Sequence, residues 1–386
     1  MDNIIQVTEY QPCGKLPDPF VLGDGTRISK PEEWTRARAE IYKTAVELQY
    51  GTLPPKPECF KAECLHDSPK MATYRITAGT AEKQVVFTVR LLKAKDLSQK
   101  RPAVVDGDLC FNAWFDSGAS KEFTENNIHV VLFNRVELVP DIKGERRTNG
   151  PLYDVYPEYT FGALGAWAWG YSRCVDLLET LDYMDMDCIA FTGHSRGGKT
   201  ALLAGAVDER AAIVNPNESG AGGAGCYRLR LKAITEDGEE KRCEMLPDLL
   251  KNFAFWMGPE MGKYADDPDK LPFDSHFMKA LVAPRVLFVS EAASDIWANP
   301  VGTWMTTMAA GEVYRFLGKE QNLLWYFRRG YHYHDLEDFR MLINVIRHYK
   351  GEGALSENFF HTPFAEPPLM YDWRAPEQKK ENEHGV

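Results

Sequence analysis

The stretch GHSRG at 193–197 constrains this chain more than any other. An apolar run at 188–191 precedes it, and a helix-like run rich in small residues follows it at 199–204. Strand, Gly-x-Ser-x-Gly and helix in this order are typical of a nucleophile elbow, a turn so tight that the residues two before and two after the serine must be small. The serine hydroxyl then lies at a helix N-terminus, where partial positive charge favours a developing anion. We therefore predict that Ser195 is a nucleophile.

Strand-like and helix-like stretches alternate along the rest of the chain. Apolar residues at helical spacing predict helices at 31–50, 162–183, 302–317 and 336–349. Short apolar runs predict buried strands at 74–77, 84–92, 102–105, 129–133, 188–191, 211–214, 285–289 and 322–327. A polar stretch at 235–241 predicts a hairpin or a loop, and the first thirty residues read as irregular.

This alternation is typical of the α/β class, in which helices cover both faces of a mostly parallel sheet. We see no internal repeat and no linker. We therefore expect a single α/β domain over residues 1–386, built as a three-layer sandwich. Residues 1–60 are predicted to form an N-terminal extension with one helix, and residues 375–386 a disordered tail.

The composition argues against several kinds of partner and cofactor. The net charge is −11, and no stripe of Lys and Arg alternates with aromatic residues, so nucleic acid is not an expected partner. No stretch approaches the roughly 20 apolar residues that span a bilayer, so we expect no membrane association. None of the eight cysteines forms a C-x-x-C pair and no cofactor motif is present, so we predict neither a metal nor a cofactor.

The first residues, MDNIIQ, lack a basic region followed by an apolar one, so no signal peptide is visible. We therefore expect a cytoplasmic protein, or a secreted one if a leader was removed before this numbering begins. We also expect a monomer.

A serine nucleophile needs a base, and two histidines follow the last predicted strand. In hydrolases with this elbow the chain order is Ser, acid, His, so the base is expected late in the sequence. We favour His334, which lies at the edge of the closing helix, over its neighbour His332, which we expect to be a packed or loop residue.

The acid of the triad has two candidates, each placed directly after a predicted strand. Glu218 follows the strand at 211–214, and Asp295 follows the strand at 285–289. Sites in open α/β sheets form at the carboxyl ends of strands, so both positions suit the role. A solvated loop position for Glu218 and a helix N-cap for Asp295 are the simpler interpretations. Spacing alone leaves the two nearly even.

Two cations stand next to the predicted nucleophile. The backbone N–H of Arg196 is expected in an oxyanion hole, and its guanidinium is placed to stabilise the oxyanion as well. Lys199 lies one helical turn after Ser195 on the same face. Two cations there suit a substrate rich in oxygens and a carboxylate product. A salt bridge to Glu218 or another acid is the simpler role for either.

These motifs together resemble those of one family. The segment GHSRGGK at 193–199 resembles the G-x-S-R-x-G-K signature of glucuronoyl esterases, carbohydrate esterase family 15. AWAWG at 166–170, ESGAGG at 218–223, LPFDSH at 271–276 and DIW at 295–297 are similar to further segments of that family. The resemblance covers most of the chain.

The resemblance implies an α/β-hydrolase fold and hydrolysis of esters between 4-O-methyl-glucuronic acid on xylan and lignin alcohols. The expected partner is therefore an ester substrate derived from glucuronoxylan. Glu218 becomes the preferred acid, because family members with this glutamate use it. The roles that the resemblance implies are nucleophile for Ser195, base for His334, acid for Glu218 with Asp295 as the fallback, oxyanion stabilisation for Arg196, and sugar binding for Lys199 and Trp297.

The chain also departs from the fungal members of the family. His194 and Asp335 stand where those members have cysteines, so their disulfide is absent. The Gln and Glu that contact sugar hydroxyls in fungal members have no clear counterpart between Arg228 and Asn252. An acetylxylan esterase or carbohydrate deacetylase is therefore the alternative enzyme, and a catalytically silent carbohydrate-binding protein is an alternative of another class. The cations beside the acyl carbon favour the uronate ester.

Overall fold

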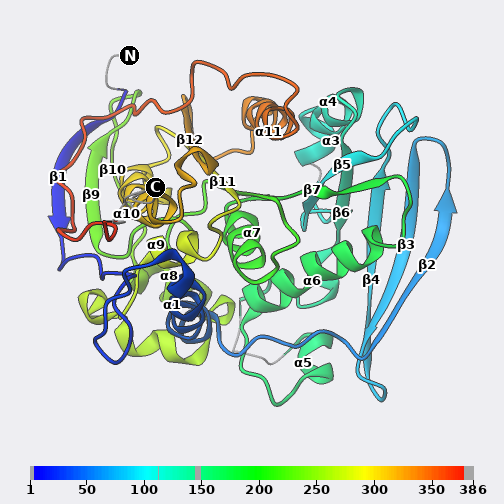
Figure 1. Ribbon diagram of the computed structural model, residues 1–386, viewed down its shortest axis with the longest axis horizontal. Helices are drawn as coiled ribbons and strands as arrows, with labels where there is room; N and C mark the ends of the chain where they lie inside the picture. The colour runs from blue at the N-terminus through cyan, green and yellow to red at the C-terminus, as the bar shows by residue number, and fades with distance from the viewer. Residues whose placement is uncertain (1–3, 112, 144–148, 378–386) are drawn as a thin grey trace, which may run out of the picture.

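The computed structural model describes residues 4–111, 113–143 and 149–377. Its centre is a nine-stranded sheet of order β12-β11-β8-β7-β5-β6-β4-β3-β2 (Figure 1). From β12 to β6 neighbouring strands pair in parallel, and β4, β3 and β2 extend the sheet antiparallel. The strands run over β2 Cys59–Asp67, β3 Met71–Gly79, β4 Gln84–Leu92, β5 Arg101–Asp106, β6 His129–Phe133, β7 Met184–His194, β8 Ile213–Asn217, β11 Val286–Ala292 and β12 Leu323–Arg328.

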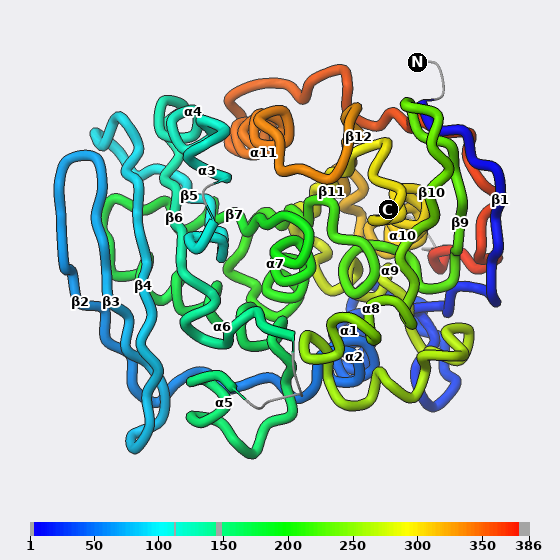
Figure 2. The backbone as a smooth tube through the Cα atoms, turned by 180° about the vertical axis from the view of Figure 1, so that it is seen from behind, coloured from blue at the N-terminus to red at the C-terminus, as the bar shows by residue number. Residues whose placement is uncertain are grey.

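Helices cover both faces of this sheet, as Figures 1 and 2 show from opposite sides. Side chains of α1, α6 and α7 belong to one apolar core, and side chains of α3, α4 and α11 to another. The predicted α/β class with a mostly parallel sheet is confirmed. The helices run over α1 Trp34–Ile41, α2 Leu48–Tyr50, α3 Ala113–Asp116, α4 Ala119–Glu125, α5 Pro151–Val155, α6 Ala163–Leu178, α7 Arg196–Val207, α8 Leu246–Phe253, α9 Ser275–Ala280, α10 Pro300–Phe316 and α11 Leu336–Tyr349.

A second, three-stranded antiparallel sheet joins β1 (Gln6–Pro12), β9 (Leu229–Ile234) and β10 (Glu240–Arg242). The polar stretch at 235–241 is thus the turn and second strand of a hairpin, one of the two predicted outcomes. The prediction that the first thirty residues are irregular is wrong for β1. Its partner β9 lies more than two hundred residues further along the chain, so the local sequence does not reveal the pairing. Most of the predicted tail at 375–386 lies outside the described residues.

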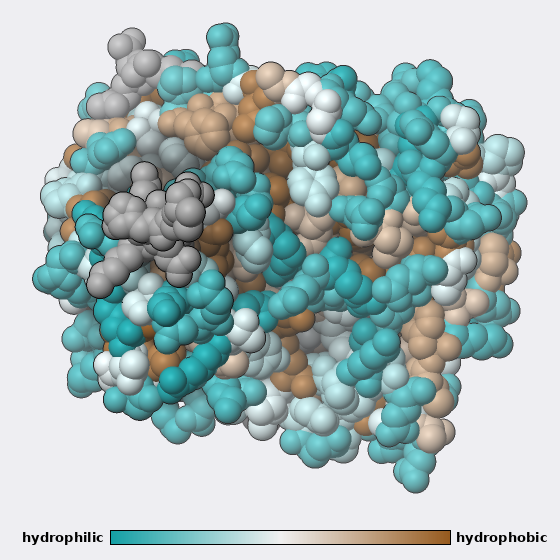
Figure 3. Space-filling view, in the orientation of Figure 1, coloured by the Kyte–Doolittle hydropathy of each residue, from teal (hydrophilic) through white to brown (hydrophobic). Residues whose placement is uncertain are grey.

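The side chains on one face of the molecule are mostly polar (Figure 3). Figure 3 shows one face that is mostly covered by hydrophilic side chains, with hydrophobic ones visible mainly in its hollows. Within the part of the chain that the structure describes, no helix is both long enough and apolar enough to cross a bilayer.

The parallel part of the sheet brings distant loops together at one edge. Strands β7, β8, β11 and β12 lie side by side and run in the same direction, so their carboxyl ends meet. Ligand sites of open α/β sheets form outside these ends. The predicted site residues follow these four strands.

Candidate active site

The turn after β7 has the geometry of a nucleophile elbow. Ser195 has φ 56° and ψ −120°, a conformation uncommon for a residue with a side chain. A Cβ added to Gly193 would lie 2.4 Å from the carbonyl carbon of Gly197, and one added to Gly198 2.6 Å from the carbonyl oxygen of Asn217. The glycines are therefore required by close backbone approach. The turn leaves Ser195 partly exposed at the start of α7.

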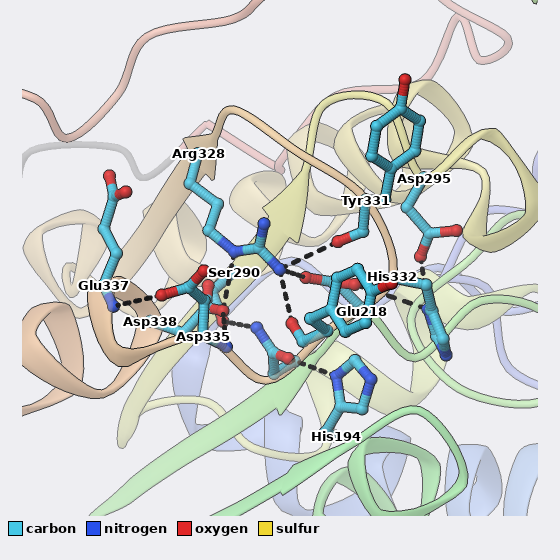
Figure 4. Close-up of polar contacts among 12 residues, drawn as sticks. His194, Glu218, Ser290, Asp295, Arg328, Tyr331, His332, Asp335, Glu337 and Asp338 are labelled. Carbon is cyan, nitrogen blue, oxygen red and sulfur yellow. Dashed lines mark hydrogen bonds and ion pairs between the residues drawn. The ribbon is translucent and has the colours of Figure 1, made fainter. Parts of the chain in front are cut away.

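His332, in the loop after β12, contacts both predicted acids (Figure 4). Its Nδ1 lies 2.6 Å from Oδ2 of Asp295 and 3.4 Å from Oε2 of Glu218. Both carboxylates are buried, whereas 41% of the histidine side chain is exposed. Two buried acids thus contact the imidazole, which stays partly exposed to solvent. Two residues that the sequence treated as alternatives form one cluster.

The structure does not bring His334, the favoured base, to these carboxylates. Its ring packs on Phe339, with 3.8 Å between ring centroids, and lies edge-on to Trp114. Burial, together with His194 and Arg328, lowers the pKa of His334 well below its usual value. In the structure His334 thus has the packed position that we expected for His332, and its role as the base stays a prediction.

The sequence did carry a signal for this exchange of roles. Asp335 caps α11, and its N–H donates to Oδ2 of Asp338 in a reciprocal capping box. The residue before such a cap packs against the fourth helical residue, here Phe339, in a hydrophobic staple. His334 occupies that position. Recognising the capping box would have left His332 as the free imidazole.

Arg328, at the end of β12, donates hydrogen bonds to several parts of this cluster. Its Nη2 donates to Oε1 of Glu218 at 2.5 Å and to the carbonyls of Tyr331, at 3.0 Å, and Tyr333, the residues on either side of His332. Its Nε donates to Oδ2 of Asp338 at 2.8 Å. One buried guanidinium therefore holds the acid, the histidine loop and the start of α11. Sequence reasoning missed this residue, because a lone Arg at a strand end carries no motif.

The charges of the cluster shift the pKa of each member. Burial lowers the pKa of His332, but the hydrogen bond to Asp295 and the charges of Asp295 and Glu218 outweigh it and raise the pKa above its usual value. Burial raises the pKa of Glu218, while His332 and Arg328 oppose the rise. The carboxylates thus stabilise the imidazolium, the form that a base acquires on taking a proton.

Arg196, the residue after the nucleophile, has a side chain held by two neighbours. Its Nη1 donates to Oδ2 of Asp141 at 2.9 Å, and its guanidinium carbon lies 4.9 Å from the ring centroid of Trp256. The indole N–H of Trp256 donates to the same carboxylate at 3.1 Å. The guanidinium is therefore held in place by an acid and an aromatic face. Its backbone N–H is the first of α7, and the first N–H groups of a helix have no partner within the helix.

Lys199 lies buried between the loop after β8 and a glutamate that the sequence did not indicate. Its Nζ donates to the carbonyls of Ser219 at 2.5 Å and Ala221 at 2.6 Å, and lies 3.8 Å from Oε2 of Glu244. Burial lowers the pKa of Lys199, and Glu244 opposes this. The acid beside Lys199 is therefore Glu244 and not Glu218.

Trp297 joins this group through the backbone. The N–H of Glu244 donates to the carbonyl of Trp297 at 2.9 Å, and 43% of Trp297 is exposed. The guanidinium carbon of Arg242 lies 5.6 Å from its ring centroid. A buried carboxylate, a buried ammonium and an exposed indole thus gather near the site. Glu244 lies between Arg228 and Asn252, where no sugar-contacting glutamate could be recognised from sequence.

His194, Glu218 and His332 form a group that could hold a metal ion. One ligand atom from each lies within 4.8 Å of the others.

Comparison with known proteins gives consistent results. The family model described as "Glucuronyl esterase, fungi" matches residues 76–318. A 4-O-methyl-glucuronoyl methylesterase of Podospora anserina is 30% identical over 314 residues, which cover 80% of this chain and 62% of the relative. That of Wolfiporia cocos is 30% identical over 311 residues, covering 79% of this chain and 72% of the relative. The match thus spans less than two thirds of the Podospora protein. These relatives give no support to the predicted cytoplasmic location.

Solved structures agree over more of the length. A carbohydrate esterase family 15 glucuronoyl esterase from Caldicellulosiruptor kristjansonii has a TM-score of 0.83 and 29% identity, covering 94% of this chain and 97% of that one. The glucuronoyl esterase catalytic domain from Hypocrea jecorina has a TM-score of 0.76 and 25% identity, covering 95% and 98%. The family match extends over more than half of the chain, and the fold, the elbow and the histidine–carboxylate cluster fit it. This chain therefore belongs to the glucuronoyl esterase family, carbohydrate esterase family 15.

Proposed function

We propose that this chain is a serine carboxylester hydrolase that cleaves 4-O-methyl-glucuronoyl esters through an acyl-enzyme. The observation that carries the proposal is the position of His332, held by two buried carboxylates in a loop at the same sheet edge as Ser195. A serine on a strained elbow with a carboxylate-bound imidazole is the arrangement that acyl transfer requires.

The reaction uses each group in turn. The neutral imidazole of His332 takes the proton as Ser195 Oγ attacks the ester carbonyl, and the resulting oxyanion is stabilised by the start of α7 and by Arg196. The imidazolium then protonates the departing alcohol, leaving an acyl-serine. Water, deprotonated by His332, attacks this ester and releases the uronic acid and free Ser195.

We assign Asp295 as the triad acid, which accepts the Nδ1–H of His332, and Glu218 as a second, supporting carboxylate. The distance from Nδ1 is shorter to Asp295, at 2.6 Å against 3.4 Å. Glu218 also shares its charge with Arg328, whose Nη2 lies 2.5 Å away, so it is the weaker acceptor. The resemblance favoured Glu218, which stays in the proposal as a support for the imidazolium.

The sugar is assigned to the group around Lys199. Lys199 and Glu244 offer donor and acceptor atoms for ring hydroxyls, and the exposed face of Trp297 suits the apolar face of a pyranose. The fixed guanidinium of Arg196 lies on the acyl side, where a uronate ester has its carbonyl. This placement favours an enzyme that binds the acyl part of the ester, as the names of the curated relatives also indicate.

Ester hydrolysis by the wild type and by Ser195→Ala tests the proposal. We expect the wild type to cleave benzyl glucuronate much faster than it releases acetate from an acetylated xyloside, and Ser195→Ala to lose both activities. Ser98→Ala, at an exposed serine, is the matched control. Faster acetate release would replace the substrate by that of a deacetylase. Full activity in Ser195→Ala would refute the mechanism.

A further inference from the structure

The residue before the nucleophile presents a free ring nitrogen to the catalytic cluster. Nδ1 of His194 lies 2.7 Å from Oδ1 of Asn217, and Nδ2 of Asn217 donates to Oγ of Ser290 at 2.9 Å (Figure 4). Because the amide nitrogen of Asn217 serves Ser290, its oxygen must accept, and His194 must carry its proton on Nδ1. The Nε2 lone pair of His194 is therefore available. A polar partner that sets the tautomer in this way is typical of metal-binding histidines.

Glu218 offers a second free lone pair. Its Oε1 accepts from Arg328, whereas its Oε2 is buried and has no hydrogen-bond partner among the described residues. Nδ1 of His332 lies 3.4 Å from this oxygen. A buried carboxylate oxygen left without a donor is costly, and a cation relieves that cost.

The three side chains converge on one point. The rings of His194 and His332 lie 4.5 Å apart between centroids, and one ligand atom from each histidine and from Glu218 falls within 4.8 Å of the others. Asp295 adds negative charge, and Arg328 opposes it.

We propose that His194, Glu218 and His332 bind a zinc-class divalent cation, and that the bound ion inhibits the enzyme by occupying the imidazole of His332. Two imidazoles and one carboxylate with a fourth position for water are a ligand set that Zn²⁺ accepts, and imidazole favours Zn²⁺, Cu²⁺ or Ni²⁺ over Mg²⁺. Metal–ligand distances of about 2.0–2.2 Å require the ligand atoms to approach one another by roughly 1 Å when the ion binds.

The inhibitory part of this inference rests on the proposed function, whereas the binding part does not. A metal ion bound to His332 prevents this imidazole from taking the proton of Ser195 and disturbs its contact with Asp295. The metal-bound enzyme is therefore inactive. This agrees with a reaction that uses no metal.

Zinc binding is measured first, by titrating ZnCl₂ into the protein against a chromophoric chelator, with MgCl₂ as the comparison. We expect wild-type protein to bind Zn²⁺ and not Mg²⁺. His194→Asn and Glu218→Gln should each weaken this binding at least 10-fold, and His66→Gln, at an exposed histidine, should leave it unchanged. Equal zinc affinity in wild type and in both ligand variants would overturn the proposal, as would no binding by the wild type.

A spectroscopic readout guards against variants that fail to fold. Co²⁺ added to the wild-type protein should give the visible absorption of a nitrogen- and oxygen-bound tetrahedral site, and Zn²⁺ should displace it. Hydrolysis of benzyl glucuronate is then measured with Zn²⁺ and after removal of the metal with EDTA. Reversible inhibition supports the second part, and full activity of the zinc-bound enzyme overturns it. If the wild type hydrolyses no ester at all, the proposed function fails while the binding result still stands.

Discussion

Replacing His332 by glutamine removes the imidazole that the structure holds 2.6 Å from Asp295. Glutamine keeps a polar side chain of similar reach but cannot take the proton of Ser195. General-base catalysis contributes about 10²–10⁴ in rate, which corresponds to about 3–5 kcal/mol of the activation barrier. Because the sugar contacts assigned to Lys199 and Glu244 are untouched, we expect kcat to fall by this factor and KM to change little.

His334→Phe is the matched control for this loss. The ring of His334 packs at a tilt on Phe339, with 3.8 Å between ring centroids, and phenylalanine preserves this contact, so the start of α11 should stay intact. Because His332 and its acids are unchanged, we expect kcat within about threefold of wild type. A fluorophosphonate probe should still label Ser195.

The assay is release of benzyl alcohol from benzyl glucuronate, normalised by active-site labelling and accompanied by a thermal melt. A folded His334→Phe protein that has lost activity, beside an active His332→Gln protein, would show that the roles of the two histidines are reversed. The geometry of the cluster would then not be that of the working enzyme.

Three further predictions concern the groups around the histidine. Asp295→Asn should reduce kcat more than Glu218→Gln. The same variant should move the acidic limb of the kcat/KM profile to lower pH. The hydrogen bond to Asp295 raises the pKa of His332, so its loss lets the neutral base form at a lower pH. An acidic limb at the same pH as in the wild type contradicts this. Arg328→Gln should destabilise the fold by about 3–5 kcal/mol in denaturant unfolding and lower kcat at saturating substrate, since the buried guanidinium holds an acid and the histidine loop. Unchanged unfolding would rule out that role. Glu244→Gln should raise KM for glucuronate esters and leave hydrolysis of p-nitrophenyl acetate unchanged; equal losses on both substrates argue against sugar binding.

Local sequence was sufficient for the elements whose pattern depends on close neighbours. The apolar runs, the helical spacing and the tight glycine turn around Ser195 predicted the α/β layers and the elbow, because backbone sterics and burial act over a few residues. The hairpin at 235–241 could be predicted for the same reason. Strand β1 was not, since pairing with β9 is a long-range contact that its own residues do not encode.

The site shows the same division. Sequence order supplied Ser195, two acids and two histidines, but it could not say which histidine faces the acids. That choice followed from packing: the cap of α11 turns His334 onto Phe339 and leaves His332 outside. Likewise, the buried positions of Arg328 and Glu244 have no local signature. Residue types and their order are properties of the chain, whereas the distances among side chains from β7, β8, β11 and β12 exist only once the parallel sheet has brought those strand ends together.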